Sequence, residues 1–223
     1  MAAEPVIWSE PWDVDKRLAE LGTGLTRSLL AEVVARATAA FMACTPFHPR
    51  NFAPISRWGN GVAAMRELLV PFAWTLADRD GQPLIVNPEE TLAITISGAD
   101  KETGKDTKDV QPRTPAKGTI TADAVERNGF LFAEMEADAM QKAREEARFI
   151  KNTWFLLLHF DRVTGQVRSE LSLPSRIDDE RRIVGWWERI LLEPFEFDTT
   201  PLDAAGDEGP DDGDISIEIK RRA

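Results

Sequence analysis

The sequence predicts an α+β fold in which antiparallel sheet segments pack against about three helices. Three observations predict it. Apolar residues recur at helical steps of three and four in residues 26–45 and 56–70. Short alternating or wholly apolar runs, separated by turn residues, fill residues 72–96 and 154–192. The order of helix followed by strands occurs twice, which is typical of α+β architecture.

Length and composition predict one domain over residues 1–197. The chain has 223 residues, of which 43% are hydrophobic, and a core of that size needs no disulfide or metal. We expect residues 1–24 to be loosely structured. Residues 198–223 are rich in acids, glycine and proline, which predicts a disordered acidic tail ending in a short strand-like segment.

Three segments have helical periodicity. The first begins after Thr26, a suitable N-cap, and ends at Thr45 because the residue before a proline avoids helical dihedral angles. The second has Ser56 as its expected cap and Trp58 on its expected buried face. The third covers residues 131–151, with acids early and bases late, an order that complements the helix dipole.

The strands are expected in two groups. Residues 72–76, 84–86 and 92–96 predict a three-stranded antiparallel meander, and residues 154–160 and 166–173 predict a hairpin that turns at Thr164-Gly165. For residues 182–192 we prefer a third strand over a short helix, from their β-branched and aromatic content. Between the groups, Gly98 to Gly118 reads as an exposed, mobile loop whose only large apolar residue is Val110.

The charge balance argues against phosphate-rich partners. The net charge is −11, and residues 203–214 alone contain six acids and no base. Such a chain repels nucleic-acid backbones and anionic membrane surfaces, so binding to either is disfavoured. A single cysteine, Cys44, and a start without a signal-peptide pattern favour the reducing cytoplasm.

No motif predicts a cofactor or a metal. The stretch from Gly98 to Lys105 resembles a phosphate-binding loop, but it has one residue too many between its glycines, and Asp106 stands where a hydroxyl is required. Cys44 and His48 read as a small buried residue and a loop residue. With two histidines, one cysteine and no ligand-like spacing, we expect no metal site and no cofactor.

Two acids on the predicted hairpin support an alternative. Asp161 ends one strand and Glu170 lies on the next, as in some metal-dependent nucleases, although Ser172 holds the place of the usual lysine. They are weak catalytic candidates for a metal-dependent hydrolase or nuclease of unrecognised type. The simpler reading is that Asp161 begins a turn and Glu170 faces solvent.

The stronger signals concern binding to protein. Ile215, Ile217 and Ile219 alternate behind the acidic spacer and could add a strand to a partner sheet or to the chain's own sheet. Trp186 and Trp187 should face opposite ways on a strand, so one is expected in the core and the other could contact a partner. We therefore expect a non-catalytic interaction or accessory protein, and a homo-oligomer is compatible with this reading.

Three stretches carry a resemblance. VNPEETLAITISG (residues 86–98), LSLP (171–174) and GWWERILL (185–192) resemble uncharacterised proteins of bacterial mobile genetic elements. The resemblance rests on hydrophobic framework residues and implies an accessory role in element maintenance, defence or regulation. It assigns no function to any residue.

Overall fold

The molecule is built on one eight-stranded mixed sheet. A computed structural model describes residues 4–79, 82–118, 121, 125 and 152–197. The strand order is β1-β7-β6-β5-β4-β3-β2, and β8 also pairs with β6. The strands are β1 (Val6–Trp8), β2 (Thr75–Arg79), β3 (Gln82–Val86), β4 (Leu92–Gly98), β5 (Asn152–Asp161), β6 (Gln166–Ile177), β7 (Ile183–Leu191) and β8 (Phe195–Glu196). The α+β class is as predicted.

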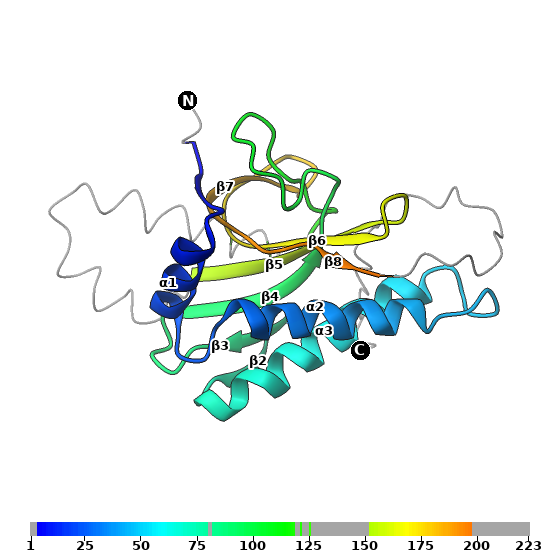
Figure 1. Cartoon of the computed structure of the whole chain (residues 1–223), viewed down its shortest axis with the longest axis horizontal. Coiled ribbons are helices and arrows are strands. Elements are labelled where there is room, and N and C mark those ends of the chain that lie inside the picture. The colour runs from blue at the N-terminus through cyan, green and yellow to red at the C-terminus, as the bar shows by residue number, and fades with distance from the viewer. Residues whose placement is uncertain (1–3, 80–81, 119–120, 122–124, 126–151, 198–223) are drawn as a thin grey trace, which may run out of the picture.

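Two long antiparallel helices cover one face of this sheet (Figure 1). They are α2 (Arg27–Met42) and α3 (Phe52–Leu69). Thr26 caps α2 as expected, since its hydroxyl accepts a hydrogen bond from the amide of Leu29 at 3.1 Å. Gly61 allows the close approach of α3, because a Cβ there would lie 3.2 Å from Ile96 Cδ1.

The second helix begins earlier than predicted. It starts at Phe52, and Ser56 is not its cap but donates a hydrogen bond to the carbonyl of Ala40 at 3.3 Å. Pro54 lies in the first turn, where a helix needs no backbone N–H donor, so the proline does not delay the helix. The 3₁₀ turn η1 (Val70–Phe72) follows α3.

Both predicted strand groups are confirmed and merge into one sheet, although the first strand begins at Thr75 and not at Phe72. β2, β3 and β4 form the antiparallel meander, and β5, β6 and β7 are antiparallel neighbours. Residues 183–191 are a strand, as preferred. The junction was not predicted: β4 is parallel to β5 along the whole length of β4, from Leu92–Asn152 to Gly98–Leu158. A parallel pair needs a crossover connection, which residues 99–151 supply.

The expectation for residues 1–24 is wrong. They contain β1, which pairs in parallel with β7, and the helix α1 (Pro11–Leu21). Val14 and Leu18 of α1 are buried in the main core. The predicted helix over residues 131–151 and the tail over residues 198–223 lie outside the described residues.

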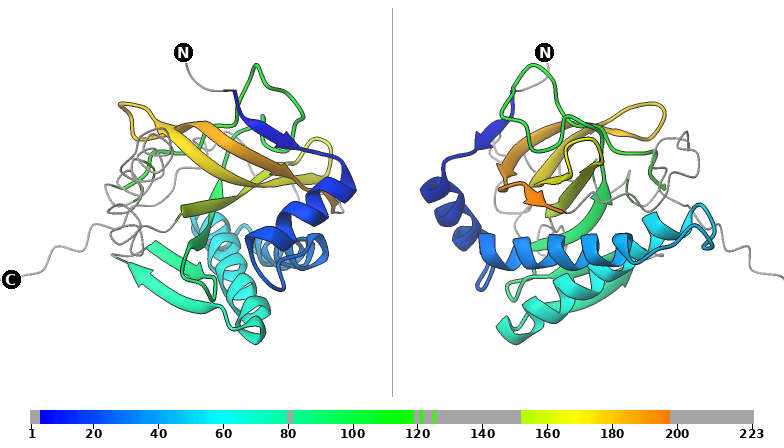
Figure 2. Two further views of the ribbon diagram at one scale, coloured as in Figure 1. Left: turned by 90° about the vertical axis from the view of Figure 1, so that its left-hand side faces the viewer. Right: turned by 45° about the vertical axis from the view of Figure 1, so that its right-hand side comes forward.

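The two faces of the sheet differ in chemistry. The face toward α2 and α3, here the helix face, is apolar and includes Ile94, Leu156 and Leu171. The opposite face, here the loop face, mixes Phe155 and Trp186 with buried polar side chains. Figure 2 shows residues 99–118 running over the loop face, away from the helices.

Candidate functional site

A buried ion pair lies at the centre of the loop face. Arg189 of β7 donates from Nη2 to Oε2 of Glu170 at 2.6 Å and from Nε to Oε1 at 2.9 Å. Both side chains are 0% exposed. The hydroxyl of Ser172 adds a hydrogen bond to Glu170 Oε1 at 2.7 Å. Glu170 therefore does not face solvent, and the sequence-based expectation for it is wrong.

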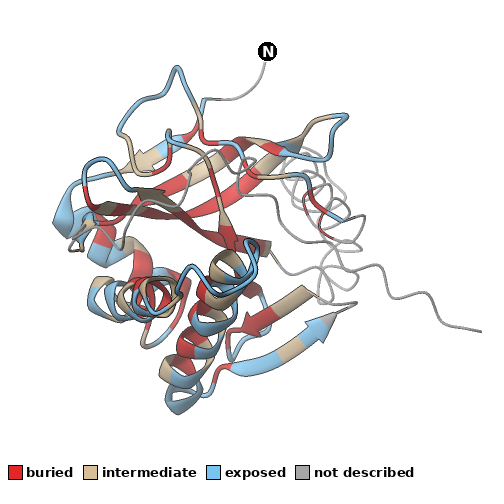
Figure 3. Ribbon diagram, turned by 90° about the vertical axis from the view of Figure 1, so that its right-hand side faces the viewer, coloured by how far each residue is buried: buried red, intermediate tan, exposed pale blue. Residues whose placement is uncertain are grey.

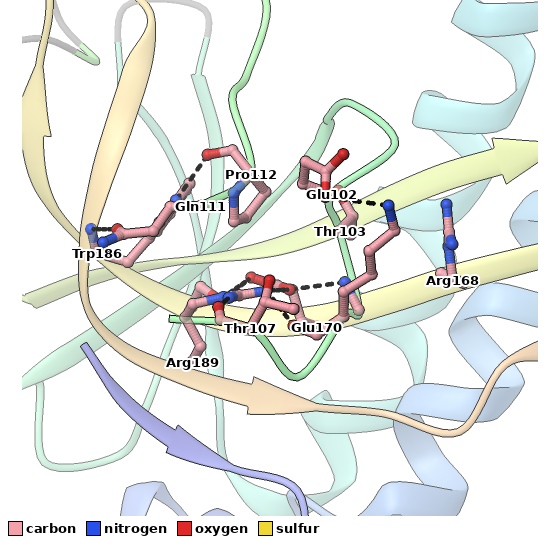
Figure 4. A network of polar contacts seen from close by, with 12 residues as sticks. Glu102, Thr103, Thr107, Gln111, Pro112, Arg168, Glu170, Trp186 and Arg189 are labelled. Carbon is pink, nitrogen blue, oxygen red and sulfur yellow. Dashed lines mark hydrogen bonds and ion pairs between the residues drawn. The ribbon is translucent and has the colours of Figure 1, made fainter. Parts of the chain in front are cut away.

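The same ion pair holds the loop (Figure 4). The amide of Gly104 donates to Glu170 Oε2 at 2.8 Å. Arg189 donates to the carbonyls of Thr107 at 3.0 Å and Lys105 at 3.1 Å. A fully buried charge is tolerated only when its hydrogen-bonding capacity is satisfied, and here the loop backbone supplies the remaining partners.

Further contacts fix the rest of the loop. Trp186 donates from its indole Nε1 to the carbonyl of Pro112 at 2.8 Å, and its amide donates to Gln111 Oε1 at 3.0 Å. Thr103 and Thr114 are buried. The predicted exposure of residues 98–118 is therefore wrong for these positions. Polar contacts hold the loop against the sheet. The one large apolar residue of the loop, Val110, is exposed, so apolar content did not indicate which loop residues are buried.

Asp161 has the turn role that the simpler reading gave it. Its Oδ1 accepts the amides of Val163 at 3.1 Å and Thr164 at 3.2 Å. These hydrogen bonds, chiefly the one from the Thr164 amide, lower the pKa of the Asp161 carboxyl. Asp161 pairs with Gln166, four residues along β6 from Glu170, which is a spacing of about 13 Å along the strand.

The two candidate acids therefore do not converge. Within residues 4–79, 82–118, 121, 125 and 152–197, no three His, Cys, Asp or Glu side chains gather into a group that could hold a metal ion. Glu170 already uses both of its oxygens on protein donors. Among the described residues, Asp161 and Glu170 thus do not form the carboxylate pair that a metal-dependent hydrolase would use to bind its metal ion.

The tryptophan pair divides between the two faces, as expected. Trp186 packs in the loop-face cluster, whereas Trp187 packs against the main core on the helix face. Because Trp186 is 0% exposed, its candidacy as a binding residue is wrong. Trp187 is half-buried. The other candidates, Ile215, Ile217 and Ile219, lie outside the described residues.

His159 joins the loop to β5. Its Nδ1 donates to the carbonyl of Ala99 at 3.3 Å. Burial is the largest influence and lowers the pKa of His159, and Arg168 acts in the same direction. The hydrogen bond to Ala99 and the charges of Asp161 and Asp100 act in the opposite direction. The folded state thus favours the neutral imidazole more than the unfolded state does.

A surface that the sequence reasoning missed lies where α2 meets α3. Phe47 is 98% exposed, and Phe52, Ile55 and Trp58 are 37–39% exposed. His48 stacks on Phe52 with ring centroids 4.6 Å apart and an interplanar angle of 10°. The prediction that Trp58 belongs to the buried helix face is wrong. The only available signal was the density of apolar residues beside three prolines in residues 46–54.

This surface, called the α2–α3 tip below, adjoins a buried arginine that packs on aromatic rings. It comprises Phe47, His48, Arg50, Phe52, Ile55 and Trp58. Beneath it the buried Arg57 lies over the Phe160 ring at 4.7 Å and over the Phe41 ring at 5.9 Å. Figure 3 shows the connection between α2 and α3 as mostly exposed. The tip is thus an apolar surface on a packed support.

Fold and site together define an α+β protein with a mixed sheet, whose buried polar centre anchors a loop and whose exposed aromatic side chains gather at one helix connection. No protein-family model, curated protein or solved structure matches the chain. Within the described part of the chain, none of the helices has the length and apolar character needed to cross a bilayer.

Proposed function

We propose that this chain is a non-catalytic interaction or accessory protein that binds a protein partner through the α2–α3 tip. The exposed aromatic surface of the tip carries the proposal. Single exposed apolar residues are common on protein surfaces, but several large apolar residues exposed within one short segment, residues 47–58, are typical of a contact site. Aromatic anchors also supply much of the binding energy in protein interfaces.

The geometry of the tip supports this proposal. Ile55 and Trp58 are three residues apart on α3, so their side chains lie on one side of the helix. The amide of Phe52 donates to the carbonyl of Pro49 at 2.9 Å, and the amide of His48 donates to the carbonyl of Thr45 at 3.0 Å. A connection that is already hydrogen-bonded loses little conformational entropy when a partner binds.

The tail supplies a second proposed contact. Ile215, Ile217 and Ile219 have the alternation needed to add a strand to a partner sheet, with the acids before them and Lys220-Arg221-Arg222 after them setting the electrostatic preference. The proposed setting is the bacterial cytoplasm, in a mobile-element, defence or regulatory system. The net charge of −11 disfavours a nucleic-acid partner. Self-association remains part of the proposal.

A quantitative affinity pull-down tests the proposal. The baits are the intact chain, a tip variant (F47S/I55S), a tail variant (I215S/I217S/I219S) and the control W12S, which removes an exposed aromatic side chain from α1. We expect F47S/I55S to lose recovery of the partner while W12S retains it. Equal recovery by all four baits would remove both surfaces from the proposal, and circular dichroism confirms that each bait is folded.

A further inference from the structure

The α2–α3 tip differs in charge from the rest of the chain. Residues 33–66 contain no aspartate or glutamate, although the full sequence has 38 acids. The segment contains four arginines: Arg36, Arg50, Arg57 and Arg66. A chain with a net charge of −11 thus has one acid-free region, and this region includes the whole tip.

Of these four arginines, only Arg50 is both exposed and on the tip. Arg36 pairs with Glu32 and Glu67, and Arg66 pairs with Asp78. Arg57 is buried under the tip. Arg50 is exposed on the connection itself, three residues after Phe47. The connection therefore carries one exposed cation within three residues of its most exposed aromatic residue.

A second cation borders the same place. Arg162, in the turn between β5 and β6, lies with its Cζ 5.2 Å from the centroid of the Phe41 ring at the end of α2. Phe41 in turn contacts Phe160, with ring centroids 4.9 Å apart. The turn after β5 therefore lies against the end of α2, where Arg162 adds a second cation next to Asp161 in the chain.

We propose that the tip binds a segment of a partner protein that is both acidic and apolar. This inference rests on the proposed function and specifies the chemistry of its partner. Apolar side chains of the segment cover Phe47 and Ile55, and its carboxylates face Arg50. The net charge of −11 disfavours the binding of such a segment to this chain in general, whereas the acid-free tip sets no carboxylate of its own against it.

This chemistry favours a short peptide segment over a polyanion. Nucleic acid needs a basic surface that extends over many phosphates. The tip offers one exposed arginine, Arg50, and the nearby end of α2 adds Arg162. A short acidic segment needs only a local match, with its apolar side chains supplying most of the affinity. Residues 203–219 of this chain also combine acids with apolar side chains. The experiment must therefore distinguish binding of a partner segment from binding of the chain's own tail.

Fluorescence anisotropy with defined probes tests the proposal on the intact chain. The probe is a short labelled peptide in which Asp and Glu alternate with Leu and Phe. Matched peptides carry Lys or Gln in place of the acids. We expect the acidic probe to bind, the Gln probe to bind more weakly and the Lys probe least, with the acidic probe weakened by salt. R50E and F47S should each raise the Kd about tenfold, and W12S should not change it.

Any of the following outcomes of these experiments would overturn the proposal. Equal binding of the three peptides, or a Kd unchanged in both R50E and F47S, removes the acidic partner while leaving the pull-down result of the proposed function standing. Binding that appears only after the six acids of residues 203–214 are replaced by their amides identifies the chain's own tail as the occupant. Dimerisation in sedimentation that R50E abolishes identifies a second copy.

Discussion

Glu170 and Arg189 form a bidentate ion pair in which neither side chain is exposed, and the backbone of residues 104–107 completes their hydrogen bonding. This relationship explains why residues 98–118 pack on the loop face although they contain few apolar side chains. Glu170, which the sequence suggested as a weak catalytic candidate, instead binds Arg189 and the loop backbone.

Removing one member of this pair should be severe. We expect E170A to lower the free energy of unfolding by about 3–5 kcal/mol, because Arg189 then remains buried without its counter-ion. Urea denaturation measures the loss. The control is E180A, whose partner Arg182 and own side chain are both largely exposed, so it should cost less than about 1 kcal/mol. Equal effects of the two variants would contradict the anchoring role.

Replacing both members of the ion pair separates the cost of an unpaired buried charge from the cost of lost packing. E170M/R189M should be less destabilising than E170A alone, because no unpaired buried charge is left, although the carbonyls of Lys105 and Thr107 lose their donor. A double-mutant cycle that includes the single variants E170M and R189M gives the coupling energy. Simple additivity of the two single variants would show that the pair is not energetically coupled.

Gly104 is the residue that brings the loop backbone to Glu170. Its φ of +72° is a left-handed conformation, and an added Cβ would lie 3.0 Å from the Cβ of Arg168. We expect G104A to cost about 1–2 kcal/mol, from backbone strain together with the crowding of Arg168. G118A is the matched control, since a Cβ there meets no atom within 4 Å. Thermal unfolding should rank G104A well below G118A.

The lowered pKa of His159 predicts a pH dependence of stability. Because the unfolded chain takes up this proton at a higher pH than the folded chain, stability is full above the ordinary histidine pKa of about 6.5 and falls as the pH is lowered toward the folded value. H159N removes the titration while its amide can still donate to Ala99. We expect the wild-type protein to lose stability relative to H159N between about pH 7 and pH 5. Parallel pH profiles would contradict this.

Glu188 should control the attachment of the N-terminal segment. It accepts the indole N–H of Trp8 at 2.7 Å and two hydrogen bonds from Arg17, one of them at 2.9 Å. These hydrogen bonds join β1 and α1 to β7. We expect E188A to speed amide hydrogen exchange over residues 4–21. E193A, which removes an exposed partner of Arg27, should leave that exchange unchanged.

Local pattern was sufficient for much of the fold. The cap at Thr26, the turn at Thr164-Gly165 and the strand over residues 183–191 all follow from interactions within a few residues, so the sequence predicts them well. The N-terminal helix was missed, although Pro11 occupies the first turn of α1, where proline is favoured.

The sequence by itself determined the α+β class, the two antiparallel groups and the acidic balance of the chain, because periodicity and composition record which residues each element must bury. Only the tertiary structure decided that β4 and β5 pair in parallel, that Glu170 is buried on Arg189 and that Phe47 lies in solvent. The physical reason is that burial and pairing depend on partners distant in the chain, and neither a carboxylate nor an aromatic ring encodes locally which partner it will meet.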